Sequence, residues 1–203
     1  MRLRNVKNKE SIMASSKYFI PSYKDYKGFN NSNPICIEIG MGKGNFIINM
    51  ALKYPNINFI GIEKYDSVLV RALQKIDKDI PNLKILRMDA KEIDKVFVKC
   101  IDKIYLNFSN PWPKDRHQKR RLTHEVFLKK YDSIFKDKKR IIMKTDNRHL
   151  FEFSLKSLTD YGYRINDISL DLYRDNYLDN IPTEYEEKFH NKGYPIYMID
   201  ISK

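Results

Sequence analysis

The stretch ICIEIGMGKGNFIINMALKYP, residues Ile35–Pro55, decides the fold. It opens with a short apolar run typical of a strand, and the glycines of GMGKG then mark a turn. After the turn, apolar residues recur at helical spacing, so the stretch predicts a strand, a glycine-rich turn and a helix in that order. This succession is typical of a parallel α/β sheet.

The same alternation continues along the chain. We expect further strands at residues 57–63, 83–89, 101–108, 139–146, 163–173 and 194–202, and helices at 65–76, from 91 onwards, at 123–135 and at 148–162. Thr123 is the expected N-cap of the helix at 123–135, and Gly162 marks the expected end of the next helix. Pro182–Gly193 is polar and is expected to be a loop. The pattern predicts a doubly wound, mostly parallel sheet.

Length and composition indicate one domain. A chain of 203 residues with 42% hydrophobic residues can bury one sizeable core, so we expect a single domain, 1–203, with a basic N-terminal arm or helix region, 1–30, and a core, 31–203. No apolar run approaches the roughly 18 residues that cross a bilayer, and no secretory signal is recognisable. We expect a cytoplasmic protein without membrane contact. Cys36 and Cys100 lack paired spacing and are predicted to be buried free thiols.

The charge balance favours an anionic partner. Lysine and arginine number 38 against 26 acidic residues, which gives a net charge of +12 and suits nucleic acid, although a genome-wide bias toward lysine would produce part of this excess. Clustering is more informative. One basic cluster comprises Arg2, Arg4, Lys7 and Lys9, and another comprises Lys114, Arg116, Lys119, Arg120 and Arg121. Either cluster can track a phosphate backbone or form a solvated surface.

Acidic residues occupy the ends of three consecutive predicted strands. Glu38 precedes the glycines, and Glu63 and Asp89 end the next two strands. Ligands of open parallel sheets bind beyond the carboxyl ends of the strands, where an acid can accept hydrogen bonds from ribose hydroxyls. The turn departs from G-x-G-x-x-G, and its acids repel pyrophosphate but tolerate a zwitterionic or cationic ligand. These properties suit S-adenosylmethionine, which carries a ribose diol, an amino-acid head and a sulfonium.

The stretch SNPWPKDRHQKRR, residues 109–121, places the only tryptophan between two prolines and ahead of the second basic cluster. Trp112 is a candidate for stacking on a nucleobase, or equally an anchor under the loop. The basic residues after it would hold phosphates. The four histidines lack metal-ligand spacing, so we expect no metal site.

Six motifs carry a resemblance to a known family. EIGMGKG, GIEKY, MDA, FSNPWPK, KTDN and TEYE, in this order between residues 38 and 186, resemble the bacterial tRNA (guanine-N7)-methyltransferase family, a branch of the class I methyltransferases. The resemblance implies a Rossmann-like fold with a seven-stranded sheet and an antiparallel last strand. It also implies S-adenosylmethionine as the methyl donor and N7 of a guanosine in the tRNA variable loop as the acceptor.

The resemblance also implies roles for individual residues. It assigns cofactor contacts to Glu38, Gly40, Gly42, Gly44, Glu63, Asp89, Ala90 and Asn110. It assigns substrate contacts, together with the stacking candidate Trp112, to Lys114, Asp146, Thr183, Glu184, Tyr185 and Glu186. RNA contacts are expected from Arg116, His117, Gln118, Lys119, Arg120 and Arg121. Asn110 and Asp146 are the candidate catalytic residues.

Asn110 departs from the family pattern, which commonly has an aspartate before Pro-Trp. The N7 atom of guanine carries a free lone pair, so its attack on a methyl group requires no proton removal and depends mainly on positioning. Asn110 can therefore position the reactants without a charge, while Asp146 or Glu186 supplies negative charge. The oligomeric state stays open between a monomer and a homodimer.

Two other functions compete with this one. The segment Ser109–Trp112 is also a variant of the Asn-Pro-Pro-aromatic loop of amino-methyltransferases, although it has only one proline before the aromatic residue. A non-catalytic RNA-binding module on a methyltransferase fold is the other alternative, and Asn110 is its best support. The intact acids and glycines of the predicted cofactor site oppose it.

Overall fold

The computed structural model describes residues 6–203, whose strands form one eight-stranded sheet in the order β1-β4-β3-β2-β5-β6-β8-β7. The strands are β1 (Phe19–Ile20), β2 (Ile35–Ile39), β3 (Asn58–Glu63), β4 (Leu83–Arg87), β5 (Lys103–Asn107), β6 (Arg140–Thr145), β7 (Arg164–Ser169) and β8 (Tyr197–Ser202). Strands β1 to β6 pair in parallel, whereas β8 is antiparallel to both β6 and β7. The predicted fold class, with its antiparallel last strand, is confirmed, and β1 adds an eighth strand that was not predicted.

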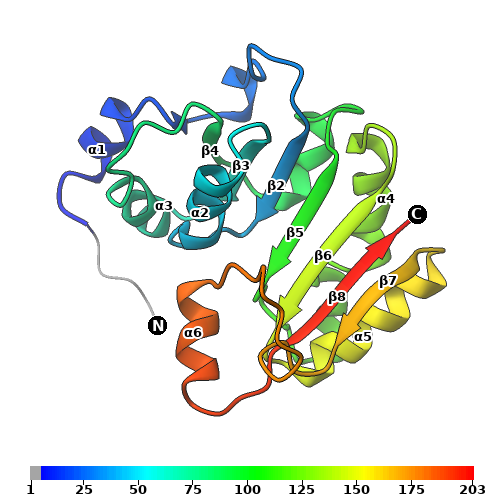
Figure 1. The fold of residues 1–203 in the computed structure, drawn as a ribbon. Helices are drawn as coiled ribbons and strands as arrows, with labels where there is room; N and C mark the ends of the chain where they lie inside the picture. Colours follow the sequence, from blue (N-terminus) through cyan, green and yellow to red (C-terminus); the bar gives the residue numbers. More distant parts are fainter. Residues whose placement is uncertain (1–5) are drawn as a thin grey trace.

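Helices cover both faces of the sheet (Figure 1). The helices are α1 (Lys9–Ser15), α2 (Asn45–Lys53), α3 (Asp66–Leu73), α4 (Glu125–Ile134), α5 (Arg148–Asp160) and α6 (Glu184–His190), and the 3-10 helices are η1 (Tyr23–Asp25), η2 (Ala90–Lys95) and η3 (Asp115–Arg120). Side chains of α1, α2 and α3 share one apolar core with β2, β3 and β4. A second core joins α4 and α5 to the sheet. Apolar runs in the strands thus face helices on both sides, as is typical of a parallel sheet.

The helix at 125–134 begins one residue later than predicted. His124, and not Thr123, is its N-cap, because Nδ1 of His124 accepts a hydrogen bond from the Val126 amide at 3.2 Å. The Thr123 hydroxyl instead bonds the Ser154 hydroxyl at 2.7 Å, where α4 packs on α5. Gly162 follows α5 with φ of 95°, so the predicted glycine stop is confirmed.

The prediction of a loop at Pro182–Gly193 is wrong, because most of this segment is α6. Its start is a capping box. The Thr183 hydroxyl accepts from the Glu186 amide at 2.9 Å, and Oε2 of Glu186 accepts from the Thr183 amide at 3.3 Å. The T-x-x-E spacing that encodes this box is visible in the sequence and is a recognised helix start.

The described part of the N-terminal region packs on the body, beginning with Val6. Met13 of α1 is buried in the core that α1 shares with α2 and α3, and β1 pairs with the edge strand β4. Arg2 and Arg4 of the first basic cluster lie outside the described residues. Cys36 is buried and Cys100 half-buried, and both are free thiols. None of the helices within residues 6–203 has the length and apolar character to cross a membrane.

Candidate functional site

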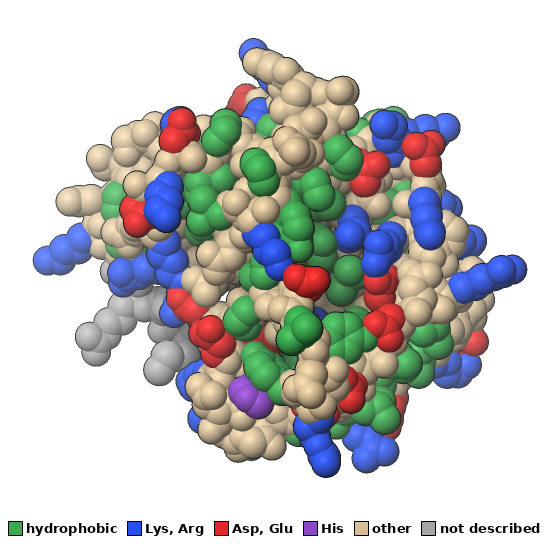
Figure 2. Space-filling view, in the orientation of Figure 1, with side chains coloured by type: hydrophobic (Ala, Val, Ile, Leu, Met, Phe, Trp, Pro, Cys, Tyr) green, Lys and Arg blue, Asp and Glu red, His purple; other side chains and the backbone are tan. Residues whose placement is uncertain are grey.

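Two adjoining cavities lie at the carboxyl ends of the parallel strands, where the arrowheads of β5 and β6 point toward α6 (Figure 1). The Glu63 cavity, about 520 Å³, is lined by Glu63, Asp89, Ala90 and the 108–112 loop. The Glu38 cavity, about 380 Å³, lies between the glycine turn and the start of α6. Gly40 and Phe108 line both cavities, so the two form one continuous site. On this face, hydrophobic side chains gather over the middle, and lysine and arginine side chains lie mainly round the edge (Figure 2).

The glycine turn connects β2 to α2 and borders both cavities. The Gly40 amide donates to the Ile62 carbonyl at 2.8 Å, which ties the turn to β3. Gly40, Gly42 and Gly44 all have positive φ values, of 79°, 57° and 76°. A side chain on Gly40 or Gly42 would point into open space, whereas a Cβ on Gly44 would lie 2.9 Å from the Cβ of Ala72. The first two glycines thus leave the backbone open to a ligand, and the third allows α2 and α3 to pack closely.

Glu63 ends β3 with its carboxylate turned toward the glycine turn. Oε1 accepts from the Lys64 and Tyr65 amides at 2.8 and 3.1 Å, and Oε2 accepts from the Gly42 amide at 3.3 Å. Burial raises the pKa of Glu63, and these amides oppose the shift. The carboxylate is fixed in orientation, and three of its roughly four lone-pair sites accept these amides. The remaining site can accept a hydrogen bond from a ribose hydroxyl in the cavity.

Glu38 and Asn107 form a buried pair beneath the glycine turn. The Asn107 amide donates to Oε1 of Glu38 at 2.9 Å. Oε2 of Glu38 and Oδ1 of Asn107 have no partner among the described residues, and both side chains line the Glu38 cavity. Two buried acceptors without donors are costly, and an ammonium group would satisfy both. The site therefore fits the amino-acid head of the predicted cofactor.

The pH dependence of stability should report on Glu38. Burial raises the pKa of this carboxyl to about 8, opposed by the Asn107 hydrogen bond and the charge of Lys144. In the unfolded chain the group loses its proton near its ordinary value of 4.5, so its contribution to stability is complete below that pH and is lost as the pH rises toward 8. Glu38→Gln should thus gain stability relative to the wild type by about 2 to 4 kcal/mol between pH 5 and pH 8.

Denaturant unfolding across this pH range checks the prediction. Glu187→Gln, which removes an exposed carboxylate of α6, serves as the control and should leave the profile unchanged. Parallel profiles for the wild type and Glu38→Gln would contradict the proposed burial cost.

The loop after β5 is a tight turn that the side chain of Arg121 stabilises. Oδ1 of Asn110 accepts from the Trp112 amide at 3.1 Å, and Trp112 itself has φ of 43°. The Arg121 guanidinium donates to the Pro111 and Trp112 carbonyls at 3.0 and 3.1 Å. Arg121 is only 4% exposed, so it anchors the loop and is unavailable to phosphates. This burial weighs against the predicted RNA contact of Arg121, which stays a prediction.

Trp112 is half-buried in the wall of the Glu63 cavity. The Arg120 guanidinium lies 4.8 Å from its ring centroid, and His117 packs edge-on at 5.7 Å. The remaining predicted RNA contacts are on or next to η3, where Lys114, Arg116, Gln118, Lys119 and Arg120 are exposed and His117 is half-buried. This arrangement presents a row of cations beside the mouth of the site.

Helix α6 brings its first residues to the Glu38 cavity. Thr183, Glu184 and Tyr185 line it, and the Tyr185 hydroxyl bonds Asp146 at 3.3 Å. The Tyr185 ring lies 5.1 Å from Phe108, which borders both cavities. The predicted substrate residues Thr183, Glu184 and Tyr185 thus form one wall of the Glu38 cavity, whereas Asp146 contacts this wall through Tyr185 and lines neither cavity.

Glu186 lies elsewhere. It is fully buried, and its Oε2 pairs with Lys144 Nζ at 2.5 Å. Glu186 is not among the residues that line either cavity, which weighs against the predicted substrate contact, and that contact stays a prediction. Sequence reasoning missed Asn107 and Phe108 as lining residues, although Phe108 is the first residue of the FSNPWPK motif and Asn107 directly precedes it.

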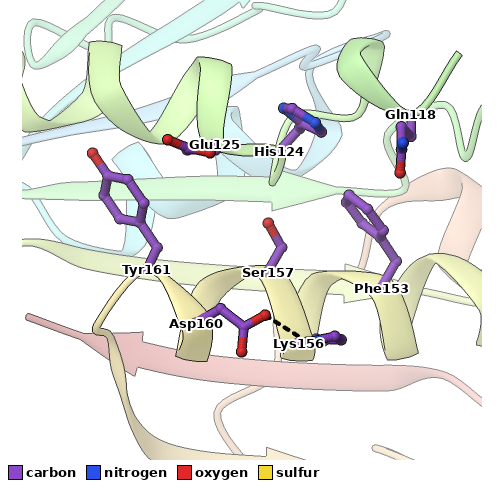
Figure 3. Close-up of a pocket in the computed structure, with 8 residues that line it drawn as sticks. All are labelled: Gln118, His124, Glu125, Phe153, Lys156, Ser157, Asp160 and Tyr161. Carbon is purple, nitrogen blue, oxygen red and sulfur yellow. Dashed lines mark hydrogen bonds and ion pairs between the residues drawn. The ribbon is translucent and has the colours of Figure 1, made fainter.

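A third cavity, about 430 Å³, lies between α4 and α5 (Figure 3). His124 and Phe153 line it with nearly parallel rings 6.3 Å apart, and Lys156 pairs with Asp160 at its edge. Gln118 is the one predicted site residue in its wall. No cluster of three or more His, Cys, Asp or Glu side chains able to hold a metal ion occurs within residues 6–203.

Comparison with known proteins shows the family of the chain. A family model described as "Putative methyltransferase" matches residues 32–199. The tRNA (guanine-N(7)-)-methyltransferase of Lysinibacillus sphaericus is 49% identical, covering 98% of this chain and 97% of that protein. The enzyme of the same name from Bacillus subtilis is 47% identical, with coverage of 99% and 98%.

Solved structures show the same fold at low sequence identity. An antibiotic-related methyltransferase matches with a TM-score of 0.63 at 18% identity, covering 99% of this chain and 96% of that one. A SAM-dependent methyltransferase from Aquifex aeolicus matches with a TM-score of 0.59 at 11% identity, covering 86% and 84%. At this identity the likeness bears on the fold alone. The full-length relatives decide the family, and the chain belongs to the tRNA (guanine-N7)-methyltransferase family.

Proposed function

We propose that this chain transfers a methyl group from S-adenosylmethionine to N7 of a guanosine in the variable loop of tRNA, with residues 31–203 as the catalytic core. The observation that carries the proposal is the pair of cavities joined at Gly40 and Phe108. The Glu63 cavity would take the nucleoside of the donor. The Glu38 cavity would take its ammonium group, next to the wall that would contact the substrate. Relatives that are nearly half identical over their whole length bear the name of this activity. A tRNA substrate would place the reaction in the cytoplasm.

The residues present suit the cofactor in three places. Glu63 would accept from a ribose hydroxyl, Asp89 and Ala90 would border the adenine, and Glu38 with Asn107 would hold the amino-acid head. S-adenosylmethionine, when bound, supplies an electrophilic methyl group. The protein's contribution to the reaction is to align the acceptor with it.

Alignment can supply most of the catalysis, since the N7 lone pair needs no general base. Holding two reactants in line is worth up to roughly 7 to 11 kcal/mol. The wall formed by Phe108 and Tyr185 would orient the guanine, and Asp146, which accepts from the Tyr185 hydroxyl, would offer a carboxylate near the positive charge that develops on the methylated base. Asn110 keeps the Trp112 turn closed through its side-chain oxygen, a task that needs no carboxylate.

The product identifies the reaction. Purified protein is incubated with unmodified tRNA transcripts and labelled donor, followed by nucleoside analysis. N7-methylguanosine makes the strand cleavable after borohydride and aniline treatment, so we expect cleavage at one guanosine of the variable loop. Label in N6-methyladenosine without cleavage would favour the amino-methyltransferase alternative. No incorporation, together with no donor binding at millimolar concentration, would favour the RNA-binding module.

The exposed cations around η3 should set the salt dependence of tRNA binding. Replacing Lys114, Arg116 and Lys119 by glutamine should make the plot of log binding constant against log salt concentration less steep. The magnitude of its negative slope should fall by about 2, because each phosphate contact contributes about 0.7 to 0.9. The matched control replaces Lys99, Lys136 and Lys138, exposed residues just before β5 and β6 at the opposite edge of the sheet. Equal slopes for the two triple variants would refute the role of this run in RNA binding.

A further inference from the structure

Lys144 of β6 is a buried cation whose three side-chain hydrogen bonds all go to one chain segment, and its Nζ also lies 5.2 Å from the ring centroid of Phe46 in α2. Its side chain is 5% exposed, and Nζ donates to Oδ1 of Asn180 at 3.0 Å, to the Ile181 carbonyl at 2.9 Å and to Oε2 of Glu186 at 2.5 Å. An ammonium has three N–H groups, so all of its donors point to residues 180–186. The contact fastens the beginning of α6 to the carboxyl edge of the sheet.

Glu186 is the carboxylate partner of Lys144 in this contact. Its Oε1 accepts from the Asn180 amide at 2.6 Å, and its Oε2 accepts from both Lys144 and the Thr183 backbone amide. The carboxylate is fully enclosed and satisfied, so neither oxygen is available to a base in the Glu38 cavity. Removing one partner of such a pair would leave the other charge buried and uncompensated.

The fastened segment carries the substrate wall. Thr183, Glu184 and Tyr185 line the Glu38 cavity directly after the residues that Lys144 holds. Glu184 adds a second, exposed link to the body by pairing with Lys43 at 2.9 Å and with Lys75. Lys144 therefore determines where this wall lies relative to the glycine turn. Its charge also acts on Glu38, the acid on the opposite wall.

We infer that Lys144 is a positioning residue for the tRNA guanosine, which acts by holding residues 180–186 against β6, and that Glu186 serves this contact and does not touch the base. The inference rests on the proposed function. It predicts a defect in using tRNA, little defect in binding the donor, and coupling between the two buried residues.

The experiment compares Lys144→Met, Glu186→Gln and the double variant on tRNA carrying either guanosine or inosine at the nucleotide that the cleavage assay identifies. Inosine lacks only the 2-amino group and keeps N7. We expect Glu186→Gln to raise KM for tRNA about tenfold with both tRNAs, and the double variant to be no worse than Lys144→Met. The donor Kd of Glu186→Gln, measured by titration calorimetry, should stay close to that of the wild type, because this variant keeps the charge of Lys144 that acts on Glu38. Glu187→Gln, on the exposed side of α6, is the control.

Three results would overturn the inference while leaving the proposed function intact. The first is a Glu186→Gln defect that disappears with inosine, because it would show that the carboxylate contacts the base. The second is a double variant whose increase in KM for tRNA equals the product of the increases in the two single variants, because the two residues would then act independently. The third is an unchanged KM for tRNA in both single variants. If Lys144→Met fails to fold, the KM values of Glu186→Gln for the guanosine and inosine tRNAs still test the inference. A wild type that methylates no guanosine overturns the proposed function, and the inference with it.

Discussion

Glu63→Ala is expected to weaken binding of S-adenosylmethionine about 10- to 100-fold, because a hydrogen bond from a ribose hydroxyl to a charged carboxylate contributes about 1.5 to 3 kcal/mol. Three backbone amides fix this carboxylate at the end of β3, so the loss is not recovered by a neighbouring group. Titration calorimetry with the donor alone measures the effect without any tRNA.

Two controls accompany this variant. Glu152→Ala removes an exposed carboxylate of α5, paired with Arg148 and remote from both cavities, and should leave the affinity unchanged. Far-UV circular dichroism must show that Glu63→Ala keeps its fold, since the Gly42 amide loses an acceptor. A folded Glu63→Ala protein with the wild-type affinity would mean that the ribose lies elsewhere.

Gly44→Ala is expected to destabilise the protein by about 2 to 5 kcal/mol in denaturant unfolding. A left-handed conformation costs a non-glycine residue about 1 to 2 kcal/mol, and forcing an extra carbon into a packed interface adds about 1 to 3 kcal/mol. Both costs apply here, since φ is 76° and the new Cβ would lie 2.9 Å from Ala72 Cβ and 3.3 Å from Ile48 Cδ1.

Gly42→Ala separates the two costs. Gly42 also has a positive φ, but a Cβ there meets nothing within 4 Å, so only the conformational cost of about 1 to 2 kcal/mol should remain. The difference between the two variants isolates the close approach of α2 to α3. Equal destabilisation would show that Ala72 moves aside and that the packing at Gly44 is loose.

Sequence patterns predicted the sheet well because its strands are apolar runs with polar ends. Each of the seven expected strands is present, and the acids at three strand ends do face the site. β1 was missed because two residues carry no period. α6 was missed for a different reason. Its charged, polar composition suggested a loop, and the capping box at its start was the signal that should have outweighed composition.

Individual roles at the site were harder to predict, since they depend on packing between distant segments. Arg120 and Arg121 are identical in type and adjacent, yet Arg120 is exposed and Arg121 is buried under the loop. Glu186 was grouped with its neighbours in TEYE, but its side chain turns inward to Lys144, 42 positions earlier in the chain. A sequence gives residue types at a motif, whereas the direction in which each side chain points is set by the tertiary contacts.

The measurement that tests the central claim most directly uses tRNA with 7-deazaguanosine at the target nucleotide. This analogue replaces N7 by a C–H group and keeps the Watson–Crick edge and the ring, so the base can still enter the site but has no lone pair to offer. We predict unchanged tRNA binding and no methyl incorporation at that nucleotide. Incorporation at the rate seen with guanosine would contradict the account, because the acceptor could not then be N7.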